Sequence, residues 1–181
     1  MRRFALDSDA FIFLKKLGLL KDLIDLARPP TPRLALHMTS FVARHELSSV
    51  LAELETMVKD LTLKIWDVKT KTAAFALFRE LKDGGYDKGE SELGAWIATE
   101  SKETILVSCD KAVPRMAKSL KIRSLDIGQL VVVLVKDGLI THEIAEERLS
   151  PWSNPHTGIG RPPGWTNLTD AIAKLHPLGE E

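Results

Sequence analysis

The chain has 181 residues, of which 44% are apolar and 28% are charged, enough to build one compact core. Its 25 Lys and Arg residues balance its 25 Asp and Glu residues, so no global positive field attracts nucleic acid, although a local basic face can still do so. The single cysteine, Cys109, excludes an internal disulfide framework. The N-terminus lacks a secretory pattern, and no apolar run approaches the roughly 20 residues that cross a bilayer. Composition therefore predicts a cytoplasmic protein without a membrane segment.

Short apolar runs alternate with segments of helical periodicity along most of the chain. Strands are predicted over residues 3–6, 34–38, 61–68, 104–107 and 122–125. Helices are predicted over residues 10–27 with a break at Gly18, and over 39–58, 70–82, 90–100, 111–120, 128–136 and 141–149. Strands that alternate with helices predict an α/β fold, with three α/β/α layers around a central, mainly parallel sheet.

The character of the sequence changes after Leu149. Residues 150–181 carry five of the nine prolines, four glycines and two of the four tryptophans, a composition typical of little regular structure. A short helix is predicted only over residues 169–175, and the tryptophans favour packing of this segment on the body. The sequence thus divides into a domain over residues 1–149 and a Pro/Gly-rich C-terminal extension over residues 150–181.

Acidic side chains follow two of the predicted strands. RFALD ends at Asp7 and TILVSCD ends at Asp110, and the carboxyl ends of parallel strands are where ligands bind in open α/β sheets. Glu46, and Glu90 or Glu92, can join them from helices. Clustered carboxylates raise one another's pKa unless a cation lies among them, and hard divalent ions such as Mg²⁺ or Mn²⁺ prefer oxygen ligands. This pattern predicts metal-assisted hydrolysis of a phosphodiester.

Helix capping is the competing interpretation of the same acids. Asp7 or Asp9 can cap the helix that begins near Ala10, and Asp110 can cap the helix that begins near Lys111. Asp9 is assigned to a cap or an outer position of the site. Spacing alone leaves capping and metal binding both open.

Four segments together resemble the PIN domain family. ALDSDAFIFL looks like its opening strand, acid and helix start, and TSFVARHELSSV is similar to its second motif, a helix with one glutamate. DKGESELGAWIA resembles the Gly-Glu-x-Glu helix of one subgroup, and TILVSCDKAVPRMAKSLKIRSL looks like the closing strand, acid and basic helix. Their order and approximate distances match along residues 3–149. The resemblance implies the PIN fold and a metal-dependent nuclease.

The resemblance also implies roles for particular acids. Asp7, Glu46 and Asp110 match the catalytic, metal-binding acids, with Glu90 and Glu92 as the candidates for a further catalytic acid. Glu90 and Glu92 lie about 200° apart around a helix, so normally only one can face the site. Glu92 is named as a metal ligand and both as catalytic acids, and the sequence leaves the choice between them open.

Other matching positions concern the substrate. Ser8 and Ser108 fall where the family commonly has a hydroxyl group, and are candidates for binding phosphate. Lys111 and Arg115 belong to a positive stripe after Asp110 that could also grip phosphates; an ordinary solvated helix face explains these two residues equally well.

The expected activity is that of an endoribonuclease with Mg²⁺ or Mn²⁺ as cofactor, acting on single-stranded or structured RNA. The family further implies a toxin with an antitoxin partner, and a homodimer. A PIN-like domain that binds RNA or protein without cleaving is one alternative. A haloacid dehalogenase-like phosphohydrolase is a weaker one, because Asp7 and Asp9 resemble its Asp-x-Asp opening.

Overall fold

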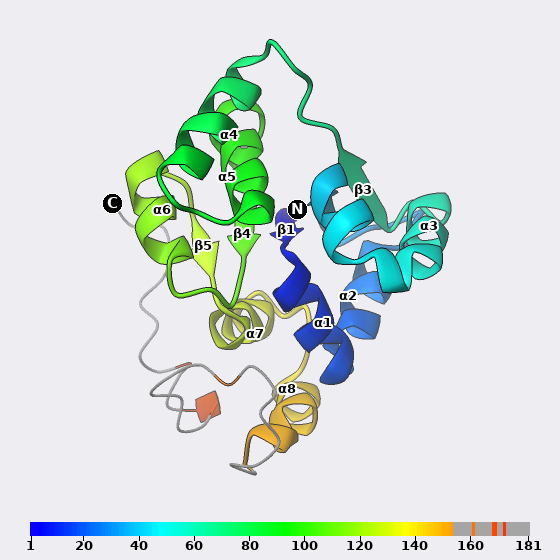
Figure 1. Ribbon diagram of the computed structural model, residues 1–181. Helices are drawn as coiled ribbons and strands as arrows, with labels where there is room; N and C mark the ends of the chain where they lie inside the picture. Colours follow the sequence, from blue (N-terminus) through cyan, green and yellow to red (C-terminus); the bar gives the residue numbers. More distant parts are fainter. Residues whose placement is uncertain (154–160, 162–167, 170–171, 173–181) are drawn as a thin grey trace.

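A five-stranded parallel sheet forms the centre of the protein in the computed structural model, which describes residues 1–153, 161, 168, 169 and 172 (Figure 1). The strands are β1 (Arg2–Leu6), β2 (Leu34–Thr39), β3 (Leu63–Trp66), β4 (Ile105–Val107) and β5 (Ser124–Leu125). They lie in the order β3-β2-β1-β4-β5, and every neighbouring pair is parallel. The predicted α/β fold with a mainly parallel sheet is confirmed.

Helices cover both faces of this sheet and complete the three layers (Figure 1). The α-helices are α1 (Ser8–Lys16), α2 (Leu19–Ala27), α3 (Leu51–Lys59), α4 (Ala73–Asp83), α5 (Lys88–Glu100), α6 (Val113–Leu120), α7 (Ile127–Lys136) and α8 (His142–Leu149). Shorter turns are the π-helix η1 (Val42–Glu46) and the 3-10 helices η2 (Ser48–Val50) and η3 (Ser150–Ser153). α4, α5 and α6 lie on one side of the sheet, while α1, α2 and α7 lie on the other.

The sheet register brings the carboxyl ends of the neighbouring strands β1 and β4 side by side. Leu6 pairs with Val107, and the backbone N–H of Asp7 donates to the carbonyl of Val107 over 3.2 Å. β1 is central and its last three residues are completely buried, as expected for a parallel strand covered on both faces. Burial of Phe4 and Leu6 contributes about 1.5–3 kcal/mol each, so a rigid part of the core holds the chain from which Asp7 projects.

The segment from Ser40 to Lys59 differs from the single continuous helix that was predicted. It begins at Ser40 but widens into η1, where the N–H of Leu47 donates to the carbonyl of Val42, five residues earlier, over 3.0 Å. Val42 and Leu47 are both buried, although residues five apart in an α-helix point about 140° away from each other. The π turn places both on the core side, which helical periodicity could not predict.

The other boundaries shift by a few residues for local reasons. α4 begins at Ala73 rather than residue 70 because the hydroxyl of Thr72 caps it, accepting from the N–H of Phe75 over 3.2 Å. α6 begins at Val113 rather than Lys111 because the carboxylate of Asp110 accepts from the N–H of Ala112 and forms a turn there.

The described part of the C-terminal extension contacts the body of the protein. Trp152 in η3 is 3% exposed and belongs to the core, and Leu168 is also buried. The helix predicted over residues 169–175 lies almost wholly outside the described residues, and the division at residue 149 stays a prediction. Within the described part of the chain, no helix is both long and apolar enough to cross a membrane.

Candidate metal centre

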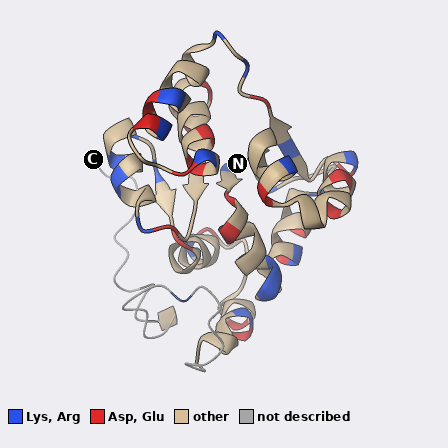
Figure 2. Ribbon diagram, in the orientation of Figure 1, with Lys and Arg blue, Asp and Glu red and all other residues tan. Residues whose placement is uncertain are grey.

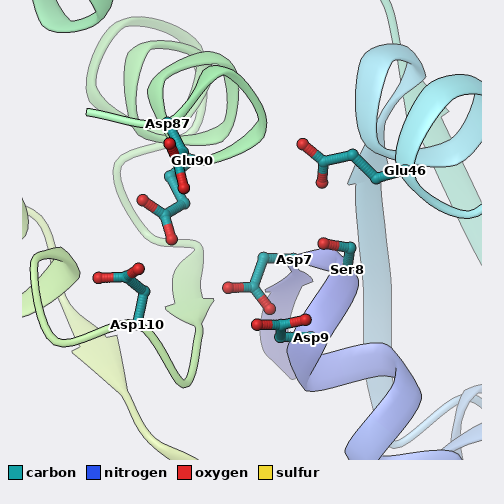
Figure 3. A pocket seen from close by; sticks show the side chains of 7 residues that line it. All are labelled: Asp7, Ser8, Asp9, Glu46, Asp87, Glu90 and Asp110. Atoms are coloured by element: carbon teal, nitrogen blue, oxygen red, sulfur yellow. The ribbon is translucent and has the colours of Figure 1, made fainter. Parts of the chain in front are cut away.

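Carboxylates from four segments line one pocket at the carboxyl ends of β1 and β4 (Figure 3). Asp7, Ser8 and Asp9 come from the start of α1, Glu46 from the end of η1, Asp87 and Glu90 from the start of α5, and Asp110 from the turn after β4. Figure 2 shows the same acidic segments close to one another, with Lys and Arg on α6 beside them. Six carboxylates thus share one small volume.

Three of these acids are close enough to share one cation. Single oxygens of Asp87, Glu90 and Asp110 all lie within 4.8 Å of one another. Glu90 is buried, Asp110 half-buried and Asp87 exposed, so the group opens to solvent on one side. An all-oxygen donor set of this kind fits a hard divalent cation such as Mg²⁺ or Mn²⁺.

Asp7 both caps α1 and faces the pocket. Its Oδ1 accepts from the N–H of Ala10 over 2.7 Å, and its side chain is 4% exposed. Burial raises the pKa of Asp7 from 3.8 to about 7; the charges of Asp9 and Glu46 raise it too, while hydrogen bonds from Ser108 and Ala10 lower it. Asp7 therefore fills both roles that the sequence left open, because it caps α1 and also lines the pocket.

Glu90 is the second acid with a strongly altered pKa. Its pKa is raised from 4.5 to about 8, first by burial and then by the charges of the nearby carboxylates Asp110, Asp7, Asp87 and Glu46, in that order. With no cation present, Glu90 and Asp7 therefore hold protons up to neutral pH. Binding a cation between them would require these protons to leave.

Glu46 reaches the pocket from the opposite side and rests against the start of α5 (Figure 3). A methyl group placed on Gly89 would lie 2.4 Å from Oε1 and 2.6 Å from Oε2 of Glu46, well inside van der Waals contact. The absence of a side chain at position 89 thus leaves room for the Glu46 carboxylate beside Glu90. This close approach is a packing reason for glycine inside a helix, where it costs about 1 kcal/mol relative to alanine.

The structure places Glu90, and not Glu92, in the pocket. The Oε2 atom of Glu92 accepts from the backbone N–H of Phe41 over 3.1 Å, and Glu92 is not among the residues that line the pocket. The prediction of Glu92 as a ligand therefore needs correction, because its carboxylate is used at the start of the helical segment that leads to Glu46. Burial raises the pKa of Glu92, and the hydroxyl of Thr39 lowers it.

The predicted phosphate-binding residues divide between the pocket and its surroundings. Ser8 lines the pocket. Ser108 lies outside the pocket lining and is buried. Its hydroxyl donates a hydrogen bond to the Asp7 carboxylate and accepts one from the N–H of Asp110 over 3.1 Å, so Ser108 positions both acids. Lys111 and Arg115 are exposed and lie outside the lining.

Asp87 is a pocket acid that was not among the predicted site residues. It occupies the N-cap position of α5, three residues before Glu90, and that helical spacing is the signal that could have found it. Of the two roles expected for Asp9, the structure favours the outer position: Asp7 is the cap, and Asp9 is an exposed residue of the pocket.

Two further residues have purely local roles. Asp126 caps α7 in a reciprocal capping box with Gln129. Burial raises the pKa of Cys109 to about 12, so this half-buried side chain remains an unreactive thiol.

No protein-family model matches this chain, and no curated protein matches it. The arrangement itself defines a carboxylate pocket that could hold a divalent cation.

Proposed function

We propose that this pocket binds Mg²⁺ or Mn²⁺ and that the protein is a divalent-metal-dependent endoribonuclease of the PIN type. The observation that carries the proposal is the convergence of six carboxylates from four segments on one pocket at the sheet edge. Structural acids are normally dispersed or paired with cations. The described lining contains only acids and Ser8, so a bound cation is the group that would balance this charge.

The residues divide the work as their surroundings allow. Asp87, Glu90 and Asp110 would hold the cation, because their oxygens already lie within 4.8 Å of one another. Asp7 and Glu46 would complete the site from β1 and η1. A bound divalent cation would supply an activated water and would neutralise charge on a phosphodiester. The Asp7 carboxylate, which lines the pocket, would accept a proton from water once the cation is bound, and the Ser8 hydroxyl can donate to a phosphate oxygen.

RNA as the substrate rests on the resemblance of residues 3–149 to PIN domains. The same resemblance supports a toxin role with an antitoxin partner, and a homodimer. These assignments share one requirement, which is a pocket able to hold the metal.

Titration with Mn²⁺ and an RNA-cleavage assay test the proposal together. Calorimetric titration should detect Mn²⁺ binding that Asp110→Asn and Glu90→Gln abolish, and cleavage of single-stranded RNA should require Mn²⁺ and disappear in Asp7→Asn and Asp110→Asn. Asp126→Asn is the matched control, because Asp126 also follows a strand and caps a helix but lies outside the pocket. Equal metal binding by the wild type and the pocket variants would refute the proposal.

Other outcomes would identify the alternatives. RNA binding without cleavage in saturating Mn²⁺ would identify a PIN-like binding domain. A phosphoryl group trapped on Asp7 would instead identify a phosphohydrolase, for which Asp7 and Asp9 lie suitably in one pocket.

A further inference from the structure

A stack of one cation and two rings stands beside the carboxylate pocket. The rings of Phe41 and His45 are nearly parallel, with centroids 4.7 Å apart and an interplanar angle of 28°. The ammonium group of Lys88 lies 4.0 Å from the centroid of Phe41. Phe41 is half-buried, whereas His45 and Lys88 are exposed. The stack therefore presents an aromatic ring and a positive charge to solvent.

The chain connects this stack directly to the acids of the pocket. His45 immediately precedes Glu46 in η1, and Lys88 lies between Asp87 and Glu90 in α5. The cation–π contact from Lys88 to Phe41 thus joins the start of α5 to the segment that ends in Glu46, on the side where Gly89 also meets Glu46.

A second aromatic–cation pair adjoins the same pocket. Tyr86 directly precedes Asp87, and the guanidinium carbon of Arg115 lies 5.7 Å from its ring centroid. Arg115 is exposed and Tyr86 half-buried. The pocket acids are therefore accompanied by two independent pairings of a ring with a cation, one beside Glu46 and one beside Asp87.

Charge and shape together indicate what these pairs bind. No Lys or Arg is among the described residues that line the pocket. Lys88 and Arg115, which lie outside the lining and contact rings beside it, are cations that can hold a polyanion across the pocket. Exposed aromatic rings beside such cations stack with unpaired bases, because every base has a π-face. In a duplex those faces are covered by neighbouring bases, and recognition relies on shape and on sugar and phosphate contacts instead.

We propose that these two pairs form nucleotide subsites on either side of the carboxylate pocket and restrict the ligand to single-stranded RNA. One unpaired base stacks on His45 while Lys88 contacts a neighbouring phosphate, and a second nucleotide contacts Tyr86 and Arg115. This inference rests on the proposed function, because the phosphate between the two subsites would lie over the pocket.

Binding measured without cleavage tests the subsites. Fluorescence anisotropy of a labelled single-stranded RNA oligonucleotide is recorded in Mn²⁺ with the Asp7→Asn protein, which should not cleave and which keeps the three acids Asp87, Glu90 and Asp110. His45→Ala in this background should weaken binding about tenfold, within the range that one base–aromatic stack contributes. His142→Ala is the matched control, because the His142 side chain is 39% exposed but lies on α8, and it should leave the affinity unchanged.

A series of oligonucleotides with one abasic position at each site along the strand identifies the stacked base. At one position, removing the base should weaken binding to the parent protein about tenfold and should leave binding to His45→Ala almost unchanged. A merely structural role of His45 would weaken all oligonucleotides equally and would overturn the inference.

The salt dependence of binding tests the cations. Lys88→Ala and Arg115→Ala should each reduce the slope of log affinity against log salt by about 0.7, the value for one phosphate contact on a single strand. Lys16→Ala is the control, because Lys16 also contacts a ring, that of Phe13, but lies at the far end of α1 from Asp7.

Two results would refute the subsites: tighter binding of a duplex than of a single strand, or equal affinity of His45→Ala and its parent. Because the assay does not depend on cleavage, loss of the nuclease proposal would leave these measurements interpretable. Conversely, if the protein is an active nuclease but its RNA affinity does not change in His45→Ala, Lys88→Ala or Arg115→Ala, the proposed function stands and the subsites are refuted.

Discussion

The buried carboxyl group of Asp7 should make the metal-free protein less stable as the pH rises. Its pKa is about 7 in the folded protein against an ordinary value of 3.8, so the folded state holds this proton to a higher pH than the unfolded state does. The contribution to the free energy of unfolding is complete below about pH 4 and is lost as the pH rises to about 7. With about 1.4 kcal/mol for each pKa unit, the full loss is about 4 kcal/mol.

Asp7→Asn removes the charge and retains the geometry. Asparagine is nearly isosteric with aspartate, can accept from the N–H of Ala10, and is an equally good N-cap. The variant should therefore match the wild type at low pH and become more stable than it at high pH. Between about pH 5 and pH 8, its free energy of unfolding relative to wild type should rise by about 2.5 kcal/mol, because part of the 4 kcal/mol is already lost below pH 5.

Urea unfolding in a chelator, followed by tryptophan fluorescence at several pH values, measures this difference. Mn²⁺ should oppose the loss of wild-type stability at high pH, because a ligand that binds only the folded state stabilises it by RT ln(1 + [L]/Kd). This stabilisation is about 2.7 kcal/mol at 100 times Kd. Only the wild type should gain this stabilisation in full. If the two proteins lose stability with pH in parallel without metal, burial of the Asp7 charge is not the cause, and the reasoning fails.

Two substitutions on α5 test the rest of the site. Gly89→Ala should displace the carboxylate of Glu46, because the added methyl group would lie 2.4 Å from Oε1. We expect the Mn²⁺ affinity measured by calorimetry to fall about tenfold, while helix propensity improves by up to about 1 kcal/mol. Unchanged affinity would contradict the packing argument. Glu92→Ala should reduce the free energy of unfolding by about 1–3 kcal/mol, because the N–H of Phe41 loses its acceptor. Glu92→Gln keeps an acceptor oxygen for this N–H. Equal unfolding midpoints in urea for these two variants would show that this hydrogen bond does not position the segment that leads to Glu46.

The sequence predicted the fold better than the details of the site. Alternating strands and helices were sufficient for the parallel sheet, because the last three residues of β1 and all of β4 form apolar runs that are buried on both faces. The break at Gly18 was also predictable, and the residue has a φ of 76°, a left-handed conformation that favours glycine.

The choice between Glu90 and Glu92 was not predictable from spacing. Both border the apolar stripe of α5 and both are buried, so the decision depends on what lies opposite each one. Glu92 faces a backbone N–H of Phe41 from a segment about 50 residues earlier, and Glu90 faces other carboxylates. Tertiary contacts of this kind leave no periodic signal in the sequence, which is also why the π turn escaped prediction.

The π turn amounts to one extra residue within a helical segment. Deleting one residue within Val42–Glu46 would restore the hydrogen bonding of an ordinary α-helix and relieve a conformation that is rare. Val42 and Leu47 would then lie four positions apart, about 40° around the helix, so both could remain on the core side. The core therefore does not require the extra residue, and a chain that is one residue shorter, with no charged group lost, would separate what the fold needs from what the pocket needs.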